Sequence, residues 1–317
     1  MRPSSGTRTA WVPFPRDEFD DLPAELDYVT WDGGAEFPAD PAPAVFYAHP
    51  LVQDPAVIAR PLVEMKRLSA VQALSAGVDH LLPLLQRLPG RVTLCTAGDL
   101  HSASTAELAL ALVLASLRGI PDYTRAQDAG RWHQRTSPSL TGADVLIVGY
   151  GAVGAALEEL LVPFGCVVTR VARTGRLSRR GAVHAVARLP ELVPQADVIV
   201  LATTATQDTR HLVDAGVLAR MKTGALLVNV ARGSVVDTPA LTAALADGRI
   251  RAALDVTEPE PLPPGHPLWS APGVVITPHV GAFTAALRSR VKSLVQSQLW
   301  RFARNEPLRY AVPYPSA

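Results

Sequence analysis

The sequence predicts an α/β protein of two domains, the larger built on a doubly wound parallel sheet. Apolar, β-rich runs recur between residues 145 and 277, with helical stretches between several of them, and most lack polar alternation. Strands buried on both faces have this pattern. The first hundred residues instead alternate short apolar runs with Pro- and Gly-rich joints. A chain of 317 residues is also longer than one hydrophobic core usually covers.

The first hundred residues predict a small α/β domain. Its strands are expected at residues 10–14, 26–31, 44–48, 70–74 and 92–95, and the spacing of apolar residues over 57–68 predicts a helix. A second helix should begin at Ser104 or Thr105, either of which can cap it, and end before Gly119. Its apolar residues lie almost all round, which predicts a buried helix.

Six strands are expected in the second domain, at residues 145–148, 167–171, 198–202, 225–230, 252–256 and 274–277. The amphipathic pattern over 286–304 follows too late to belong to this unit. We expect it to form a helix that returns to the first domain. The predicted domains are therefore a discontinuous one, residues 1–100 and 285–317, and a continuous one, residues 101–284.

Composition excludes several function classes. A net charge of +1 gives no reason to expect nucleic acid or an anionic membrane as a partner. Cys95 and Cys166 lie in apolar runs without a ligand spacing, so we expect buried free thiols and no metal site. The first thirty residues lack the apolar run of a signal peptide, and the longest apolar stretch is too short to span a bilayer. A cytoplasmic protein is the expectation.

Gly149, Gly151 and Gly154 form a G-x-G-x-x-G turn between a strand and a helix. The first glycine permits the tight turn, the second lets a pyrophosphate approach the backbone at the helix N-terminus, and the third lets helix and strand pack closely. The spacing alone is a weak signal, but its position after VLIV and before AVGAALEELL predicts a Rossmann-type dinucleotide site.

The second strand ends in Ala172, Arg173, Thr174, Gly175 and Arg176, where an acidic residue usually binds the adenosine ribose. A carboxylate would repel a 2′-phosphate, whereas arginine binds one bidentately. The cofactor expected is therefore NADP(H) in preference to NAD(H), with NAD(H) as the alternative. The competing interpretation is that these arginines only solvate an edge loop.

Polar residues follow three later strands. Arg232, Glu260 and His279 each come just after an apolar run, and ligands of open α/β sheets bind at the carboxyl ends of the strands. A histidine can protonate a carbonyl oxygen near neutral pH, and a carboxylate beside it favours and orients the protonated ring. Arginine can hold a carboxylate and still donate to the carbonyl. We therefore expect these three side chains to be neighbours in one cleft.

The chain resembles the D-isomer-specific 2-hydroxyacid dehydrogenases along essentially its whole length. The shared motifs are SAGVDHL (75–81), GYGAVG, TQDTRHL (206–212), NVARG, DVTEPEPLP and TPHVG. The residues of the DVTEPEPLP motif resemble most those of the glyoxylate/hydroxypyruvate reductase branch, which often uses NADP(H). The resemblance implies a Rossmann-type cofactor domain and a smaller, discontinuous, flavodoxin-like substrate domain.

The resemblance also implies residue roles. Arg232 binds the 2-oxo acid and polarises its carbonyl, His279 is the acid/base, and Glu260 pairs with His279. Ala76 and Gly77 offer backbone N–H groups to the substrate carboxylate, and Asp255 contacts the nicotinamide carboxamide. The expected cofactor-binding set is Gly149, Tyr150, Gly151, Ala152, Val153, Gly154, Arg173, Thr174, Arg176, Thr203, Thr204, Thr209, Val230, Ala231, Asp255, His279 and Gly281.

Relatives form dimers through the cofactor domain, and the segment 118–140, expected to be an irregular arm, is the candidate for such a contact. Formate is disfavoured as a substrate, because that branch has Gln where this chain has Glu260. Two alternatives stay open. One is a transcriptional corepressor of the same fold that senses dinucleotide, and the other is a phosphite-type dehydrogenase. Corepressors of this fold usually carry terminal extensions, whereas this chain ends soon after its last expected helix. We therefore expect the enzyme rather than the corepressor.

Overall fold

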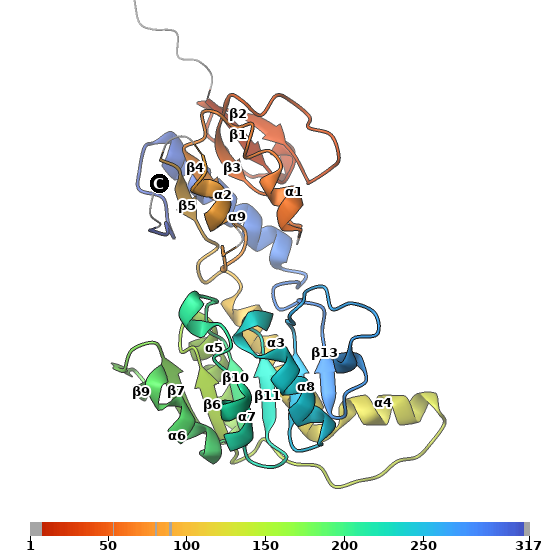
Figure 1. Ribbon diagram of the computed structural model, residues 1–317. Helices are drawn as coiled ribbons and strands as arrows, with labels where there is room; N and C mark the ends of the chain where they lie inside the picture. Colours follow the sequence, from red (N-terminus) through yellow and green to blue (C-terminus); the bar gives the residue numbers. More distant parts are fainter. Residues whose placement is uncertain (1–7, 53, 80, 89–90, 314–317) are drawn as a thin grey trace, which may run out of the picture. The chain divides into compact units, whose positions relative to one another are not determined.

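The computed structural model describes residues 8–52, 54–79, 81–88 and 91–313, which fall into two compact units (Figure 1). One unit comprises residues 1–101 and 285–317, and the other residues 102–284. The first boundary lies one residue after the predicted one. Each unit contains a largely parallel sheet, which confirms the predicted α/β class.

The first unit has a five-stranded parallel sheet in the order β2-β1-β3-β4-β5. Its strands are β1 (Arg8–Val12), β2 (Leu26–Thr30), β3 (Ala44–Ala48), β4 (Ala70–Gln72) and β5 (Thr93–Cys95), and its helices are α1 (Pro55–Ala59), α2 (Leu82–Leu85) and α9 (Leu287–Ala303). All five predicted strands are present with slightly shifted ends. The predicted helix over 57–68 is wrong in extent: α1 ends at Ala59, because Pro61 has no N–H to continue the ladder.

Helix α9 belongs to the first unit because it buries an apolar stripe there. Val291, Val295 and Leu299 recur every four residues and pack in one core cluster with Ala10 and Phe46 of the sheet. Figure 1 shows α9 beside the strands of this unit. We predicted this placement because the helix follows too late to belong to the second domain, and residues 285–317 do belong to the first unit.

The second unit has an eight-stranded sheet in the order β13-β12-β11-β10-β6-β7-β9-β8. Its strands are β6 (Asp144–Val148), β7 (Val167–Ala172), β8 (Arg176–Ser178), β9 (Gly181–Ala185), β10 (Val198–Leu201), β11 (Leu226–Asn229), β12 (Arg251–Leu254) and β13 (Val274–Ile276). Its helices are α3 (Ser102–Arg118), α4 (Ile120–Asp128), α5 (Ala152–Leu161), α6 (Leu189–Leu192), α7 (Ala215–Arg220) and α8 (Thr238–Ala246).

Core clusters cover both faces of this sheet, as its unbroken apolar strands require. Leu112 of α3 and Leu157 of α5 belong to the cluster on one face, while Leu218 of α7 and Leu241 of α8 belong to the other. The order reverses at β6, so β7 and β10 lie on either side of it. Ligands of doubly wound sheets bind outside the carboxyl ends of the strands at such a point.

The β8–β9 hairpin was not predicted. Its strands pair antiparallel at the edge of the sheet, with β9 parallel to β7. The sequence RLSRRG is polar and mostly exposed, so it lacks the apolar signal of a buried strand, and charged edges of this kind protect a sheet from pairing with other chains. Arg176, which the competing interpretation placed in an edge loop, is the first residue of β8.

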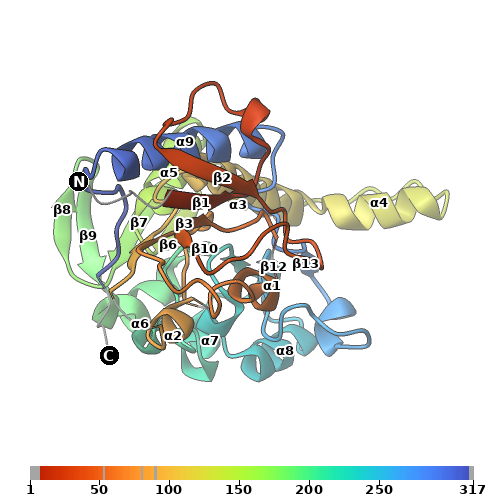
Figure 2. The same ribbon diagram turned by 90° about the horizontal axis from the view of Figure 1, so that it is seen from above.

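The segment 118–140 also differs from expectation, because it is not irregular throughout. Helix α4 occupies most of its first half, buries only Ala126, and projects from the rest of its unit (Figure 2). Among the described residues no single helix is long and apolar enough to cross a membrane; only the bent pair α3 and α4 passes that test, by length and composition alone. Helix α5 ends at Leu161, two residues before Pro163.

Both cysteines are free thiols. Cys95 is buried, and this burial raises its pKa to about 11. Cys166 is only partly buried, in contrast to the prediction.

Candidate active site

The three glycines after β6 have three different surroundings. Gly149 has φ +101°, and a Cβ there would lie 2.4 Å from the Thr203 nitrogen. A Cβ on Gly154 would lie 2.6 Å from the Gly149 carbonyl oxygen, so the helix approaches the turn too closely for any side chain. A Cβ on Gly151 would meet no atom within 4 Å. The open space at the one glycine expected to face a pyrophosphate fits a dinucleotide at this helix N-terminus.

The end of β7 is tied to the glycine turn. The Val171 carbonyl accepts hydrogen bonds from the N–H groups of Gly149 and Tyr150, both at 2.9 Å. Arg173 and Thr174 follow within three residues and are exposed. Arg176, although largely exposed, already has a partner: its guanidinium donates to the Tyr150 carbonyl at 2.5 Å. The two arginines predicted to bind phosphate thus differ, since Arg176 also buttresses the turn.

Sequence reasoning missed an ion pair that fixes Tyr150. The Tyr150 hydroxyl donates to Glu158 at 2.5 Å, and Arg170 donates to the same carboxylate through Nε at 2.8 Å. The hydrogen bond to Glu158 raises the pKa of Arg170, and burial followed by Glu158 raises the pKa of Tyr150. The sequence shows only an acidic residue within the apolar run AVGAALEELL, and the structure shows that this residue, Glu158, is 3 % exposed.

The threonines after β10 form a self-contained turn. The Thr209 hydroxyl donates to the Thr204 carbonyl and accepts from the Thr206 N–H, both at 2.8 Å. Thr203 packs against Gly149 through its backbone nitrogen. The predicted cofactor residues on this loop therefore lie beside the glycine turn at Thr203, while Thr209 holds the loop.

Arg232 lies just after β11 in a turn that Asn229 shapes. The Asn229 side chain donates to the Arg232 carbonyl at 2.9 Å and accepts from the Ala231 N–H at 3.0 Å. A Cβ on Gly233 would lie 1.9 Å from the Thr257 carbonyl oxygen, so only glycine lets this turn abut the segment after β12. Val230 and Ala231, predicted to contact cofactor, have buried side chains.

His279 and Glu260 form the predicted pair. The ring Nδ1 lies 2.5 Å from Glu260 Oε1, with side chains 36 % and 38 % exposed, so solvent reaches both. His279 has φ +53°, a conformation that costs a non-glycine residue free energy and that the surroundings must impose. β11, β12 and β13 are parallel neighbours, and the loops after them carry Arg232, Glu260 and His279 at one edge of the sheet.

Asp255 imposes that conformation. Its buried carboxylate accepts from the Thr277 hydroxyl at 2.6 Å and from the N–H groups of Val280 at 2.9 Å and Gly281 at 3.0 Å. These bonds bracket His279. Asp255 therefore anchors the loop that carries His279. Its contact with the nicotinamide carboxamide stays a prediction.

A second ionic cluster holds the segment that carries Glu260. Glu258 accepts from Arg210 at 2.8 Å and lies 3.4 Å from His211 Nε2. The hydrogen bond from Arg210, with a smaller effect of His211, lowers the pKa of Glu258. Two residues of the TQDTRHL motif thus hold the segment that carries Glu260 by bonding to Glu258. The spacing of residues along the chain does not reveal this contact.

Ala76 and Gly77 belong to the first unit, on the loop after β4. Ala76 is exposed and Gly77 half-buried. Among the described residues their N–H groups donate no hydrogen bond, as a site for a carboxylate requires. His80 of the same motif lies outside the described residues.

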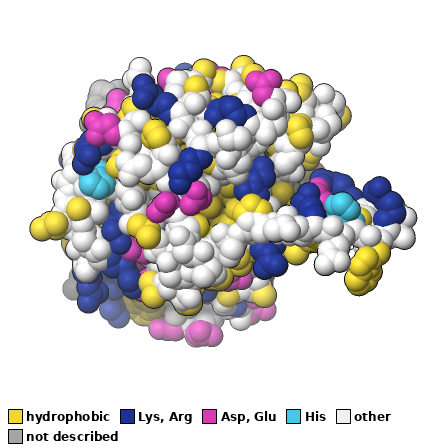
Figure 3. Space-filling model, turned by 90° about the horizontal axis from the view of Figure 1, so that it is seen from below, with side chains coloured by type: hydrophobic (Ala, Val, Ile, Leu, Met, Phe, Trp, Pro, Cys, Tyr) yellow, Lys and Arg dark blue, Asp and Glu magenta, His cyan; other side chains and the backbone are white. Residues whose placement is uncertain are grey.

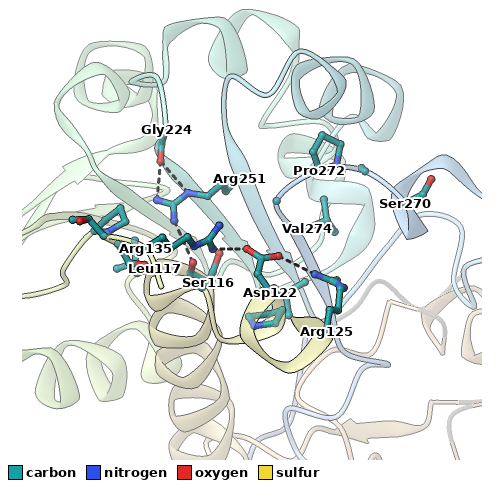
Figure 4. A pocket seen from close by; sticks show the side chains of 18 of the residues that line it. Ser116, Leu117, Asp122, Arg125, Arg135, Gly224, Arg251, Ser270, Pro272 and Val274 are labelled. Atoms are coloured by element: carbon teal, nitrogen blue, oxygen red, sulfur yellow. Dashed lines mark hydrogen bonds and ion pairs between the residues drawn. The ribbon is translucent and has the colours of Figure 1, made fainter. Parts of the chain in front are cut away.

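A cavity of about 710 Å³ lies elsewhere in the second unit, near the start of β12. In Figure 4, Asp122 lies between Arg125 and Arg135, and Arg251 points at the Gly224 carbonyl. Burial, with a smaller contribution from Arg135, lowers the pKa of Arg251. None of the predicted site residues lines this cavity.

Three comparisons with known proteins found chains similar to this one. Residues 110–281 match the family model "D-isomer specific 2-hydroxyacid dehydrogenase, NAD binding domain". The human glyoxylate reductase/hydroxypyruvate reductase is 36% identical over 252 residues, 76% of each chain.

Two solved structures are similar over nearly the whole chain. A D-isomer specific 2-hydroxyacid dehydrogenase from Xanthobacter autotrophicus, in complex with NADPH, has a TM-score of 0.78 at 29% identity and covers 97% of this chain and 98% of its own. An NADPH-dependent glyoxylate/hydroxypyruvate reductase from Sinorhizobium meliloti, with NADP and malonate, has a TM-score of 0.78 at 25% identity and covers 97% of each chain.

Proposed function

Because the chain belongs to the D-isomer specific 2-hydroxyacid dehydrogenase family, we propose that it reduces a small 2-oxo acid of the glyoxylate or hydroxypyruvate type to the D-2-hydroxy acid, with NADP(H) as the preferred cofactor. The observation that carries the proposal is the 2.5 Å pair of His279 and Glu260, from the loops after β13 and β12. The neighbouring loop after β11 carries Arg232. Reduction of the carbonyl of a 2-oxo acid needs a proton donor and a cation that binds the acid group. His279 with its Glu260 partner supplies the first, and Arg232 supplies the second.

The glycine turn would hold the cofactor, which supplies the hydride when bound. Gly149, Gly151 and Gly154 give the pyrophosphate its approach to the backbone at the start of α5. The rest of the cofactor would lie along the carboxyl ends of the strands. The groups that would border it there are the loop of Thr203, Thr204 and Thr209, the backbone of Val230 and Ala231, and Gly281.

Each catalytic side chain has one task. Arg232 holds the substrate and donates to the carbonyl oxygen, which stabilises the charge that develops there. His279, doubly protonated beside Glu260, gives its Nε2 proton to that oxygen as the alkoxide forms. Glu260 accepts from Nδ1–H and stabilises the protonated ring. Ala76 and Gly77 donate their N–H groups to the substrate carboxylate.

Two observations support NADP(H) over NAD(H). The chain offers Arg173 and Thr174, both exposed, directly after the strand end that is bonded to the glycine turn. The relatives from Xanthobacter autotrophicus and Sinorhizobium meliloti were crystallised with NADPH and NADP. Arg176 stabilises the glycine turn through its hydrogen bond to the Tyr150 carbonyl.

We further propose a homodimer that uses the segment 118–140. This segment projects from its unit and carries both apolar and charged side chains (Figures 2 and 3). Trp132 is 97 % exposed and Ile120 is 51 % exposed. Apolar side chains exposed in this way often mark a surface that binds another protein. Sedimentation of the intact chain should give the mass of a dimer, and Trp132→Ser should weaken it; a monomer at micromolar concentration would contradict this.

Glu260→Gln is expected to lower kcat for the reduction. The carboxylate accepts a charge-assisted hydrogen bond from the Nδ1–H of His279 that orients the ring, and a neutral amide oxygen accepts more weakly. Because both side chains are more than a third exposed, we expect a modest loss of kcat, smaller than that of His279→Gln. The measurement is kcat for wild type and variant, with KM for NADPH as the control. A variant with wild-type kcat would remove Glu260 from the mechanism.

The function is tested by following NADPH oxidation with a panel of 2-oxo acids that includes glyoxylate and hydroxypyruvate. Turnover of either supports the proposal. Failure with the whole panel, together with dinucleotide-dependent binding of a peptide partner, would favour the corepressor alternative, and oxidation of phosphite would favour the phosphite-type dehydrogenase.

A further inference from the structure

Two buried histidines hold both main-chain groups of one residue, Leu74. The Leu74 N–H donates to His49 Nε2 at 2.9 Å, and the Leu74 carbonyl lies 2.7 Å from His101 Nε2. His49 is 3 % exposed and His101 9 %. His49 follows β3 and His101 precedes α3, so two separate segments meet at this one residue.

The partners define the state of each ring. His49 Nδ1 lies 2.7 Å from the Pro50 carbonyl and must donate, so Nε2 is the acceptor and the ring is neutral. His101 Nε2 faces a carbonyl and must donate. Burial lowers the pKa of His101, with a smaller effect of Arg290 in the same direction, and so favours its neutral ring.

Leu74 immediately precedes the loop that carries Ala76 and Gly77. Its side chain is buried in the core, so both its main chain and its side chain are fixed. The carbonyls of the loop are also occupied: the Ser75 carbonyl accepts from the Ala97 N–H at 2.9 Å, and the Ser75 hydroxyl donates to the Gly77 carbonyl at 2.7 Å. The N–H groups of Ala76 and Gly77, which donate to no described residue, remain for a ligand.

We propose that His49 and His101 are positioning residues that pre-organise the Ala76 and Gly77 N–H groups for the carboxylate of the substrate. This inference rests on the proposed function. Donors that are already aimed need no reorganisation when an anion binds, so they contribute to affinity more than the same donors on a loose loop. Neither histidine touches the reacting atoms.

The test compares His49→Phe and His101→Phe with His49→Gln and His101→Gln. Phenylalanine fills the space but has no polar atom, whereas the glutamine amide can accept from the Leu74 N–H or donate to its carbonyl. Each Phe variant should raise KM for the 2-oxo acid roughly three- to tenfold, the equivalent of one hydrogen bond. KM for NADPH and kcat at saturation should change by less than about twofold, and the Gln variants should recover most of the wild-type KM.

Tyr28→Phe is the matched control. It removes a hydrogen bond of 2.7 Å to the Pro23 carbonyl in the same unit, away from the loop, and should leave KM unchanged. Amide hydrogen exchange gives a readout that needs no activity: the Leu74 N–H should exchange faster in His49→Phe than in wild type or Tyr28→Phe.

The possible failures are distinguishable. An enzyme that is active on 2-oxo acids, with unchanged KM in both Phe variants or unchanged Leu74 exchange in His49→Phe, would overturn the positioning role alone. A wild type that reduces no 2-oxo acid would overturn the proposed function, and the positioning role with it.

Discussion

Replacing His279 by glutamine lowers kcat roughly 10²-fold or more in our account, the usual effect of losing a positioned general acid. Glutamine keeps a polar group near the ring position, but it cannot take up and release a proton. The bonds of Asp255 to the loop around His279 do not involve the ring, so the fold of the site should survive. Steady-state kinetics give kcat, and fluorescence titration gives the affinity for NADPH, which should change much less.

His266→Gln is the matched control. His266 lies in the same unit and accepts from the Leu268 N–H at 3.2 Å, a bond that glutamine can replace. It is outside the proposed machinery and should retain wild-type kcat. If His279→Gln kept kcat within a few-fold of wild type, His279 would not be the acid.

The second large effect concerns the cofactor. Preference for NADPH over NADH is expected to be roughly tenfold to a few hundredfold in kcat/KM, because a charge-assisted hydrogen bond contributes about 1.5–3 kcal/mol. Arg173→Ala should remove much of this preference and leave NADH kinetics nearly unchanged, since NADH has no 2′-phosphate. Ala172→Asp combined with Arg173→Ala should invert it, because the carboxylate binds the ribose and repels phosphate.

Variants of two further arginines separate a specific contact with the 2′-phosphate from a general effect of nearby charge or of the glycine turn. Arg179→Ala removes one exposed charge from the turn between β8 and β9 and should leave the preference intact. Arg176→Ala should weaken both cofactors, because it removes the bond to the Tyr150 carbonyl in the glycine turn. All measurements need one ionic strength, since salt screens exposed charges. Wild-type preference for NADH, or equal weakening of both cofactors in Arg173→Ala, would make these arginines a solvated edge.

The sequence predicted the fold well wherever apolar periodicity is strong. Most of the predicted strands of the second unit are apolar runs, and the amphipathic pattern over 286–304 predicted helix α9. It failed at the β8–β9 hairpin, where RLSRRG carries no burial signal. It also failed at α1, whose ladder Pro61 interrupts, and at α4, a helix with one buried residue.

The candidate site shows the same division. The residues at strand ends were predictable, because all strands of a parallel sheet present their carboxyl ends at one edge. Their supports were not. The Asp255 carboxylate under the His279 loop, the Arg210–Glu258 pair and the two histidines at Leu74 each join residues more than 20 positions apart. Such contacts arise from packing, which pattern and spacing do not encode.

The stereochemistry of one product tests the central claim most directly. Purified protein is incubated with NADPH and hydroxypyruvate, and the glycerate formed is quantified by chiral chromatography alongside the NADPH consumed. We predict D-glycerate in a one-to-one ratio with oxidised cofactor, and roughly a hundredth as much or less with His279→Gln in the same time. L-glycerate, or no glycerate from a protein that binds NADPH, would contradict the assignment of this chain as a D-specific 2-oxo acid reductase.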